Sequence, residues 1–306
     1  MSRPFDLLCV IGPTATGKTR LAVALARSLG GEVLSADSRQ VYRGMDIGTG
    51  KDRSEYGDGE SAVPAHLLDL VDAGQEFHLF DFQRAFRAAY EDVSRRKALP
   101  ILCGGSGLYV DAIVNAYRLV EAPPDPVLRE ELADESDDEL VQRLADLRPL
   151  HNTTDTRDRE RLIRAIEIAQ KTRDTEGEPP EFPPLRSRVY GLRADRSTLR
   201  SRIADRLAAR LAAGLVDEVR GLRNAGLSAD RLDRYGLEYR FVTRHLEGVL
   251  TLDEMTRQLE SQIYRFAKRQ VTWFRRMERQ GTRIHWINAE TPLREMVAGV
   301  LQSLPE

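Results

Sequence analysis

Eight residues near the start of the chain have the types and the spacing of a phosphate-binding loop. The segment reads Gly12-Pro13-Thr14-Ala15-Thr16-Gly17-Lys18-Thr19, which matches the pattern G-x-x-x-x-G-K-[ST]. In such a loop, successive backbone N–H groups converge on phosphate oxygens. Lys18 adds a positive charge for the terminal phosphate, and the hydroxyl of Thr19 is placed to ligate Mg²⁺. The segment therefore predicts a site for a diphosphate or triphosphate.

A carboxylate, Asp37, follows the next predicted strand, residues 32–36. Ligands of open α/β sheets lie beyond the carboxyl ends of the strands, so we expect Asp37 on the same edge as the phosphate loop. There it could hold Mg²⁺ through water or accept a proton from an attacking nucleophile. The alternative is an aspartate that caps the turn after it, and its position alone favours neither reading.

Two further features are weaker signals. A second glycine turn, residues 104–107, follows a predicted strand at 100–103 and includes Ser106. Glycines there would allow the backbone to approach a ligand closely. Arg202 and Arg206 are four residues apart and so lie on one side of a predicted helix. Two guanidinium groups suit a diphosphate, although they could equally pair with surface acids such as Asp205.

The segment from Arg265 to Arg283 is strongly basic, with seven Lys or Arg residues against one acid, Glu278. Aromatic residues are interspersed with these cations, as in a helix that lies along a sugar-phosphate backbone. A second basic run lies between 157 and 173, and there we favour ion pairs with neighbouring acids such as Glu167. The net charge of −2 excludes a global field that attracts nucleic acid, so any such binding depends on local patches.

Apolar periodicity predicts the elements that must position these groups. Short apolar runs at 7–11, 32–36, 100–103, 188–192 and 283–287 are typical of buried parallel strands, and residues 21–29 and 80–96 have helical spacing. The fold class is α/β, with a P-loop NTPase-like core, a central parallel sheet and flanking helices. Proline-rich segments bound an inserted, mostly helical subdomain. We expect residues 1–120 and 187–306 to form the core and residues 121–186 to form the insert.

The 306 residues are 41% hydrophobic and 31% charged, which is typical of soluble globular proteins. Cys9 and Cys103 lie in apolar runs, so we expect reduced core cysteines. No leader-like segment opens the chain, and no apolar run approaches the length of a membrane span. We expect a cytoplasmic monomer without membrane contacts.

The motifs together resemble those of the tRNA dimethylallyltransferases, also called tRNA isopentenyltransferases. Besides residues 12–19, the resemblance rests on Asp-Ser-Arg-Gln-Val-Tyr at 37–42, Met-Asp-Ile-Gly-Thr at 45–49, His-Leu-Leu-Asp at 66–69, Gly-Gly-Ser-Gly-Leu-Tyr at 104–109, Arg-Leu-Ile-Arg-Ala-Ile-Glu at 161–167 and Ala-Lys-Arg-Gln-Val-Thr-Trp-Phe-Arg at 267–275. These enzymes transfer a prenyl group from dimethylallyl diphosphate to N6 of the adenosine at tRNA position 37, next to the anticodon. The resemblance extends over almost the whole chain.

This resemblance implies a role for each matching position. The loop with Lys18 and Thr19 would hold the prenyl diphosphate and Mg²⁺, and Asp37 would be the general base. Ser106 would orient the substrate, while Arg202 and Arg206 would bind the diphosphate. The tRNA anticodon stem-loop would be contacted by Asp37, Ser38, Arg39, Gln40, Ser106, Arg129, Glu160, Arg161, Leu162, Ile163, Arg164, Lys268, Arg269 and Gln270.

The sequence departs from the family wording at residues 151–155 and at Gly-Leu-Glu-Tyr-Arg, residues 236–240. Three alternatives to tRNA prenylation fit parts of the sequence. A P-loop small-molecule kinase would leave the basic segment without a role. An adenylate isopentenyltransferase has a mononucleotide acceptor and little need of the insert. A non-catalytic RNA-binding regulator would need neither Lys18 nor Asp37.

Overall fold

The computed structural model describes residues 4–148, 158–174 and 184–305. The chain divides into two compact units. The core unit comprises Met1–Ala116 and Pro184–Glu306, and the insert unit comprises Tyr117–Pro183. The insert unit thus begins four residues before the position expected from the sequence, 121, and ends three residues before 186.

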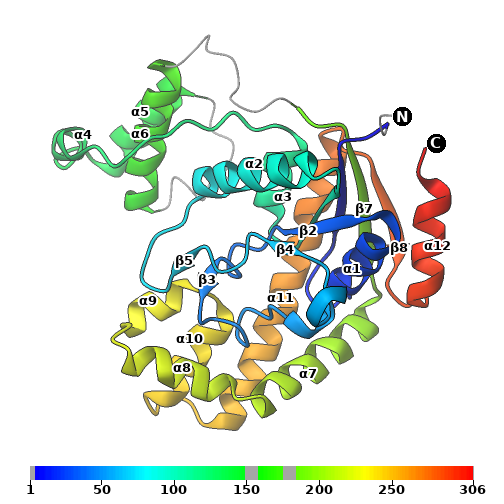
Figure 1. Cartoon of the computed structure of the whole chain (residues 1–306). Coiled ribbons are helices and arrows are strands. Elements are labelled where there is room, and N and C mark those ends of the chain that lie inside the picture. Colours follow the sequence, from blue (N-terminus) through cyan, green and yellow to red (C-terminus); the bar gives the residue numbers. More distant parts are fainter. Residues whose placement is uncertain (1–3, 149–157, 175–183, 306) are drawn as a thin grey trace. The chain divides into compact units, whose positions relative to one another are not determined.

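A six-stranded parallel sheet forms the centre of the core unit (Figure 1). Its strands follow the order β4-β2-β6-β1-β7-β8, and each pairs in parallel with its neighbours. Their bounds are β1 Leu7–Ile11, β2 Gly31–Ser35, β4 Ala65–His66, β6 Leu99–Gly104, β7 Ser187–Arg193 and β8 Ile284–Asn288. This confirms the predicted α/β class. Because β1 lies between β6 and β7, the loop that follows β1 emerges near the middle of the sheet edge.

Helices cover both faces of the sheet. On one face, α1 (Lys18–Leu29) and α12 (Leu293–Ser303) pack together with alternate strand residues such as Leu8 and Val10. The other face carries α2 (Leu79–Arg95) and α3 (Gly107–Val114), both in contact with β6. Burial on both faces explains why the strands read as continuous apolar runs. Cys9 and Cys103 are buried free thiols in this sheet, as predicted.

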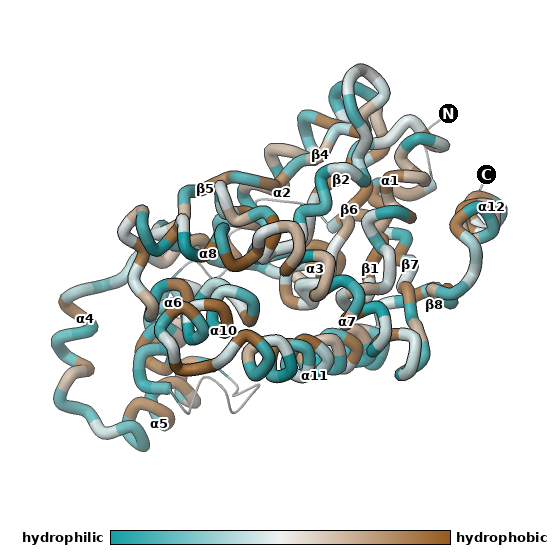
Figure 2. Tube along the Cα trace, turned by 90° about the horizontal axis from the view of Figure 1, so that it is seen from below, coloured by the Kyte–Doolittle hydropathy of each residue, from teal (hydrophilic) through white to brown (hydrophobic). Residues whose placement is uncertain are grey.

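A second hydrophobic core lies among the helices after β7. These are α7 (Arg196–Ala212), α8 (Leu215–Asn224), α9 (Ala229–Arg234), α10 (Leu237–Leu246) and the long α11 (Leu252–Arg279). Apolar and hydrophilic residues alternate along α11 (Figure 2), as expected of a helix with one face on a core. The short paired strands β3 (Tyr42–Arg43) and β5 (Val71–Asp72) pack against this core. Between them the loop has 3₁₀ turns at Arg53–Tyr56 and Gly59–Ser61, and Tyr56 packs instead in the core of the sheet and α1.

The insert unit is built from α4 (Pro126–Glu131), α5 (Asp137–Leu147) and α6 (Arg159–Asp174). Asp125 and Ser136 cap α4 and α5 by accepting hydrogen bonds from backbone N–H groups of the first turn. Leucines and alanines of the three helices form their own small core. Among the helices that the structure describes, none is long and apolar enough to cross a membrane.

Candidate active site

The glycine loop between β1 and α1 has the backbone conformation that its sequence requires. Gly12 and Gly17 have φ angles of 156° and 80°, where side chains other than glycine are strained. At Gly12 a Cβ would also lie 2.9 Å from the carbonyl oxygen of Leu192. The buried Thr16 hydroxyl donates to the carbonyl of Pro13 at 2.8 Å and so fixes the loop from within.

Lys18 occupies the first turn of α1, and its ammonium donates to the carbonyl of Pro13 at 3.4 Å. Burial lowers the pKa of Lys18, and the nearby positive charge of Arg206 lowers it further. Asp37 and Asp52 lie near enough to act in the opposite direction. The structure therefore brings Lys18, Asp37 and Arg206 to one edge of the sheet, together with Asp52, which sequence reasoning missed.

Asp37 and Ser106 follow neighbouring strands, β2 and β6, and are linked through Ser38. The Ser38 N–H donates to Oγ of Ser106 at 2.9 Å, and the Ser106 N–H donates to the carbonyl of Ala36 at 3.2 Å. Oδ1 of Asp37 accepts from the Arg39 N–H at 2.9 Å. One carboxylate oxygen thus caps the turn, while no described residue forms a hydrogen bond with the other. Asp37 can therefore cap its turn and still hold Mg²⁺ through water or accept a proton, so the two alternatives that the sequence left open are compatible.

Gly104, Gly105 and Gly107 allow protein atoms to pack closely against the turn after β6. A Cβ on Gly104 would lie 2.1 Å from the carbonyl oxygen of Ala36. A Cβ on Gly105 or Gly107 would lie 2.5 Å from the side chain of Gln270 or Trp273, respectively. The turn after β6 therefore packs directly against the turn after β2 and against α11.

Gln270 has both ends of its amide engaged and is only 7% exposed. Its Oε1 accepts from the Thr14 N–H at 2.9 Å, and its Nε2 donates to the carbonyl of Gly105 at 2.8 Å. Gln40 is similar, since Ser35 donates to its Oε1 at 2.9 Å and its Nε2 donates to the carbonyl of Gly50 at 3.0 Å. Both residues were expected to contact tRNA, whereas here their amides hold loops together.

The two arginines predicted to bind diphosphate lie at different places. Arg206 contacts the glycine loop, since its Nη1 donates to Oγ1 of Thr14 at 3.4 Å, and it also forms an ion pair with Asp52. Arg202 donates instead to the carbonyl of Ala289 at 3.0 Å, just after β8. In this structure Arg206 is the arginine at the glycine loop.

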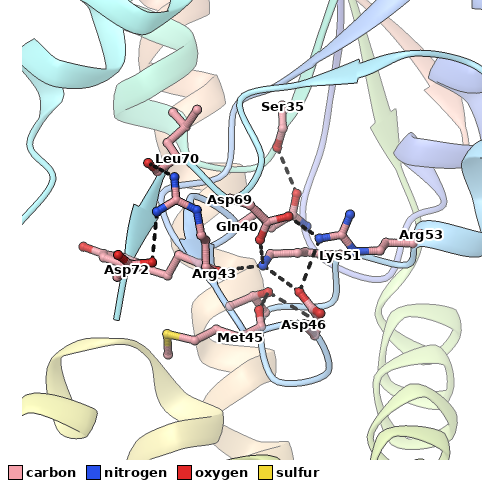
Figure 3. A network of polar contacts seen from close by, with 12 residues as sticks. Ser35, Gln40, Arg43, Met45, Asp46, Lys51, Arg53, Asp69, Leu70 and Asp72 are labelled. Atoms are coloured by element: carbon pink, nitrogen blue, oxygen red, sulfur yellow. Dashed lines mark hydrogen bonds and ion pairs between the residues drawn. The ribbon is translucent and has the colours of Figure 1, made fainter. Parts of the chain in front are cut away.

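A buried lysine ties together two of the motifs that carry the resemblance (Figure 3). Lys51 is 1% exposed and donates to the carboxylates of Asp46 and Asp69 and, at 2.6 Å, to the carbonyl of Tyr42. Asp69 also accepts from Arg53. The segments 45–49 and 66–69 therefore meet at one ammonium group, which places the next residue, Asp52, beside Arg206.

The cations of α11 differ from those of the insert unit. Exposed Lys268 lies 4.8 Å from the ring centre of Tyr264, and exposed Arg269 lies 5.7 Å from that of Phe266. Neither forms an ion pair with a carboxylate of the described residues. Both cations are therefore available to bind phosphate groups of a nucleic acid.

In the insert unit, Arg164 forms an ion pair, as the sequence favoured for the run from 157 to 173, and so does Arg129. Arg129 forms two bonds with Glu167, Nε to Oε1 at 2.6 Å and Nη2 to Oε2 at 3.2 Å, and Arg164 adds a third at 2.9 Å. The Leu162 side chain is buried in the insert core, so it is not available to RNA. Glu160, Arg161 and Ile163 are at least partly exposed, and residues 151–155 lie outside the described residues.

Comparisons with known proteins assign the family. A family model described as IPP transferase matches residues 40–277, and one described as isopentenyl transferase matches residues 5–60. A tRNA dimethylallyltransferase 2 of Syntrophotalea carbinolica is 55% identical over 294 residues, which are 95% of this chain and 97% of the relative. A tRNA dimethylallyltransferase 1 of Porphyromonas gingivalis is 50% identical over 296 residues, 97% of this chain and 98% of the relative.

A solved structure shows the same fold. The full-length tRNA isopentenylpyrophosphate transferase from Bacillus halodurans superposes with a TM-score of 0.68 at 31% identity. The alignment covers 98% of this chain and 96% of that one. Matches of this length include the glycine loop, Asp37, the second glycine turn and α11. The chain therefore belongs to the IPP transferase family, whose curated members that match it are named tRNA dimethylallyltransferases.

Proposed function

We propose that this enzyme transfers a dimethylallyl group from dimethylallyl diphosphate to N6 of the adenosine at position 37 of tRNA. The proposal rests on one observation. At one edge of the sheet, the phosphate loop with Lys18 and Arg206 lies near the carboxylate of Asp37. A diphosphate leaving group and an amine nucleophile need these two kinds of group side by side. Membership of the family supports the reaction class.

The proton transfer and the departure of the diphosphate are each assigned to residues of this site. The adenine N6 attacks C1 of the dimethylallyl group while the bond from C1 to the diphosphate oxygen breaks. Asp37 accepts the proton that N6 loses. Lys18, Arg206 and the loop N–H groups stabilise the negative charge that gathers on the departing diphosphate. The target base must leave the anticodon-loop stack, which costs a few kcal/mol.

The residues present fit a Mg²⁺ ion that is bound mainly by the donor. Mg²⁺ commonly takes one or two protein oxygens and fills its shell with phosphate oxygens and water. The hydroxyl of Thr19 in the first turn of α1 would supply such an oxygen, and the described residues contain no cluster of three acidic, His or Cys ligands that would form a metal cage. When bound, the ion would neutralise charge on the diphosphate.

Recognition of the tRNA would use the exposed cations of α11, Lys268 and Arg269, as contacts to phosphates. Ser38 and Arg39, next to Asp37, are placed to approach the target nucleotide. In the insert unit the exposed Arg161 and Glu160 remain candidate contacts. Arg129 and Arg164 would contact RNA either while they keep their bonds with Glu167 or after giving them up.

One incubation tests the reaction. Radiolabelled dimethylallyl diphosphate and unmodified tRNA are mixed with the enzyme, and label in the RNA is measured and mapped by nuclease digestion. We expect label on one adenosine next to the anticodon, abolished when that position is changed to another base. In a parallel incubation with AMP in place of tRNA, label on AMP would identify an adenylate isopentenyltransferase instead. In another with ATP and no tRNA, hydrolysis of ATP coupled to phosphorylation of a small molecule would identify a kinase.

A further inference from the structure

Another arginine of α7, Arg210, lies beside Arg206. Arg210 follows Arg206 by four residues and so lies on the same side of the helix. Its side chain is 13% exposed and forms an ion pair with Glu238 of α10, whose side chain is 16% exposed, with Nη1 and Oε1 2.9 Å apart. A buried guanidinium is tolerated only with a partner, because its desolvation is costly. Glu238 is that partner.

The guanidinium groups of Arg206 and Arg210 both pack against the backbone of Gly50. A Cβ placed on Gly50 would lie 1.8 Å from Nη2 of Arg210 and 2.8 Å from Nη2 of Arg206. Gly50 also has a φ of 64°, and its carbonyl accepts from Gln40. Two residues later, Asp52 pairs with Arg206. The two arginines and the two carboxylates, Asp52 and Glu238, thus form one neutral cluster around this backbone.

Glu218 of α8, which accepts a hydrogen bond from Tyr239 of α10, anchors the preceding part of the loop. The carboxylate of Glu218 accepts from the backbone N–H groups of residues 46, 47 and 48, at 2.7 to 2.9 Å. Tyr239 donates to Oε1 of Glu218 at 2.8 Å, and its ring lies where a Cβ on Gly48 would be. Glu238 and Tyr239 belong to residues 236–240, where the sequence departs from the family wording.

We propose that Arg210 and Glu238 are positioning residues that hold the guanidinium of Arg206 at the glycine loop for the donor's diphosphate. The inference rests on the proposed function for the identity of that ligand. Without Arg210, the space beside Gly50 opens and Arg206 gains alternative rotamers. Without Glu238, Arg210 keeps an unneutralised charge next to Arg206, and the repulsion displaces both.

The electrostatics of the pair agree with this role. Burial lowers the pKa of Arg210, which is opposed by the negative charge of Glu238, and the positive charge of Arg206 lowers it further. Burial likewise raises the pKa of Glu238, while Arg210 and Arg206 lower it. Each group therefore favours the charged form of the other, and the positive charge of Arg206 lowers the pKa of both.

The test is a double-mutant cycle with Arg206. Arg210→Met removes the charge and keeps the length of the side chain, and it is made in the wild-type protein and in Arg206→Ala. Binding of inorganic diphosphate is measured by calorimetry, and KM and kcat for transfer to tRNA are measured alongside. We expect about a 10-fold loss of diphosphate affinity in the wild-type background and less than about 2-fold in Arg206→Ala, because the effect passes through Arg206.

Two controls separate positioning from folding. Arg220→Met breaks an exposed pair with Asp217 on α8 and should leave diphosphate affinity unchanged. Arg210→Met combined with Glu238→Leu replaces the buried pair by apolar groups, which should restore the unfolding temperature but not the affinity. Equal losses in both Arg206 backgrounds, or none in the wild type, would overturn the inference. Failure of the unmodified protein to bind diphosphate would instead reject the proposed donor.

Discussion

Asp37 caps its own turn with one carboxylate oxygen and has the other available for the proposed proton transfer. One oxygen is fixed by the Arg39 N–H, which sets the orientation of the carboxylate, and the other has no hydrogen bond from the described residues. In the proposed mechanism, a base held in this way would lose little rotational freedom when it meets N6. The neighbouring Ser38–Ser106 link keeps the turn itself in place.

Replacement of Asp37 by Asn should slow chemistry and leave binding nearly unchanged. The amide keeps the size of the side chain and can still accept from Arg39, but it cannot take the proton. Single-turnover transfer should therefore fall by about 10²–10⁴-fold, while the affinities for tRNA and donor stay within about 2-fold. Rapid-quench kinetics measures the first quantity and filter binding the second.

Rescue of that variant by added Mg²⁺ would mean that Asp37 serves the metal ion. A near wild-type transfer rate would remove Asp37 from the mechanism. Arg39→Ala is the matched comparison, because it keeps the backbone N–H that holds Asp37.

At the scale of elements, α11 connects the edge with the glycine loops to the exposed cations Lys268 and Arg269. The buried Gln270 and the partly buried Trp273 lie against the glycine turn after β6, and Gln270 also holds Thr14 of the phosphate loop. Its exposed side chains Lys268 and Arg269 are within one turn of these contacts. A helix that is fixed on one face and basic on the other can present cations to phosphates at little entropic cost.

Neutralising Lys268 and Arg269 to Gln together should weaken tRNA binding and flatten its salt dependence. Each lost phosphate contact reduces the slope of log K against log salt by about 0.7–0.9, so a loss of about 1.4–1.8 is expected. Fluorescence anisotropy with an anticodon stem-loop RNA between low and moderate salt measures the slope.

The control for that experiment is Arg234→Gln with Arg294→Gln, which removes the same charge from exposed positions on α9 and α12. If both double variants changed the slope equally, only net charge would matter. An unchanged slope in the α11 variant would show that its cations do not meet phosphates.

At the scale of the whole molecule, the insert unit has its own acid-sensitive centre. Glu167 is buried, and although burial alone would raise its pKa, the bonds from Arg129, Arg164 and the Asp125 N–H lower it to about 2, from 4.5. Because the folded pKa is the lower one, this carboxylate stabilises the unit fully above about pH 4.5. The stabilisation is lost as the pH falls toward 2.

Glu167→Gln should therefore destabilise the insert unit by about 2–3 kcal/mol at neutral pH and make its unfolding less dependent on acid. Hydrogen exchange of peptides from α6, followed by mass spectrometry on the full chain between pH 6 and 3, reports on this unit directly. Glu130→Gln, at an exposed position of α4, serves as the control. Equal acid sensitivity of α6 in both variants would contradict the assignment.

The sequence by itself determined the features that depend on local order. The glycine loop, the strands at 7–11 and 188–192, and the helix that stops at Gly30 follow from residue types at short spacing, because backbone conformation and periodicity are local properties. The edge on which Asp37 lies followed too, since parallel strands end on one side. The family was recognisable because its motifs are short and contiguous.

Tertiary structure alone decided which of these residues meet. Arg206 rather than Arg202 reaches the glycine loop because the packing of α7 sets which turn faces Thr14. Gln270 bridges two loops far from it in the chain, and Gly105 and Gly107 leave room for side chains of α11. Such contacts depend on strand order and helix packing, and no spacing along the chain encodes them.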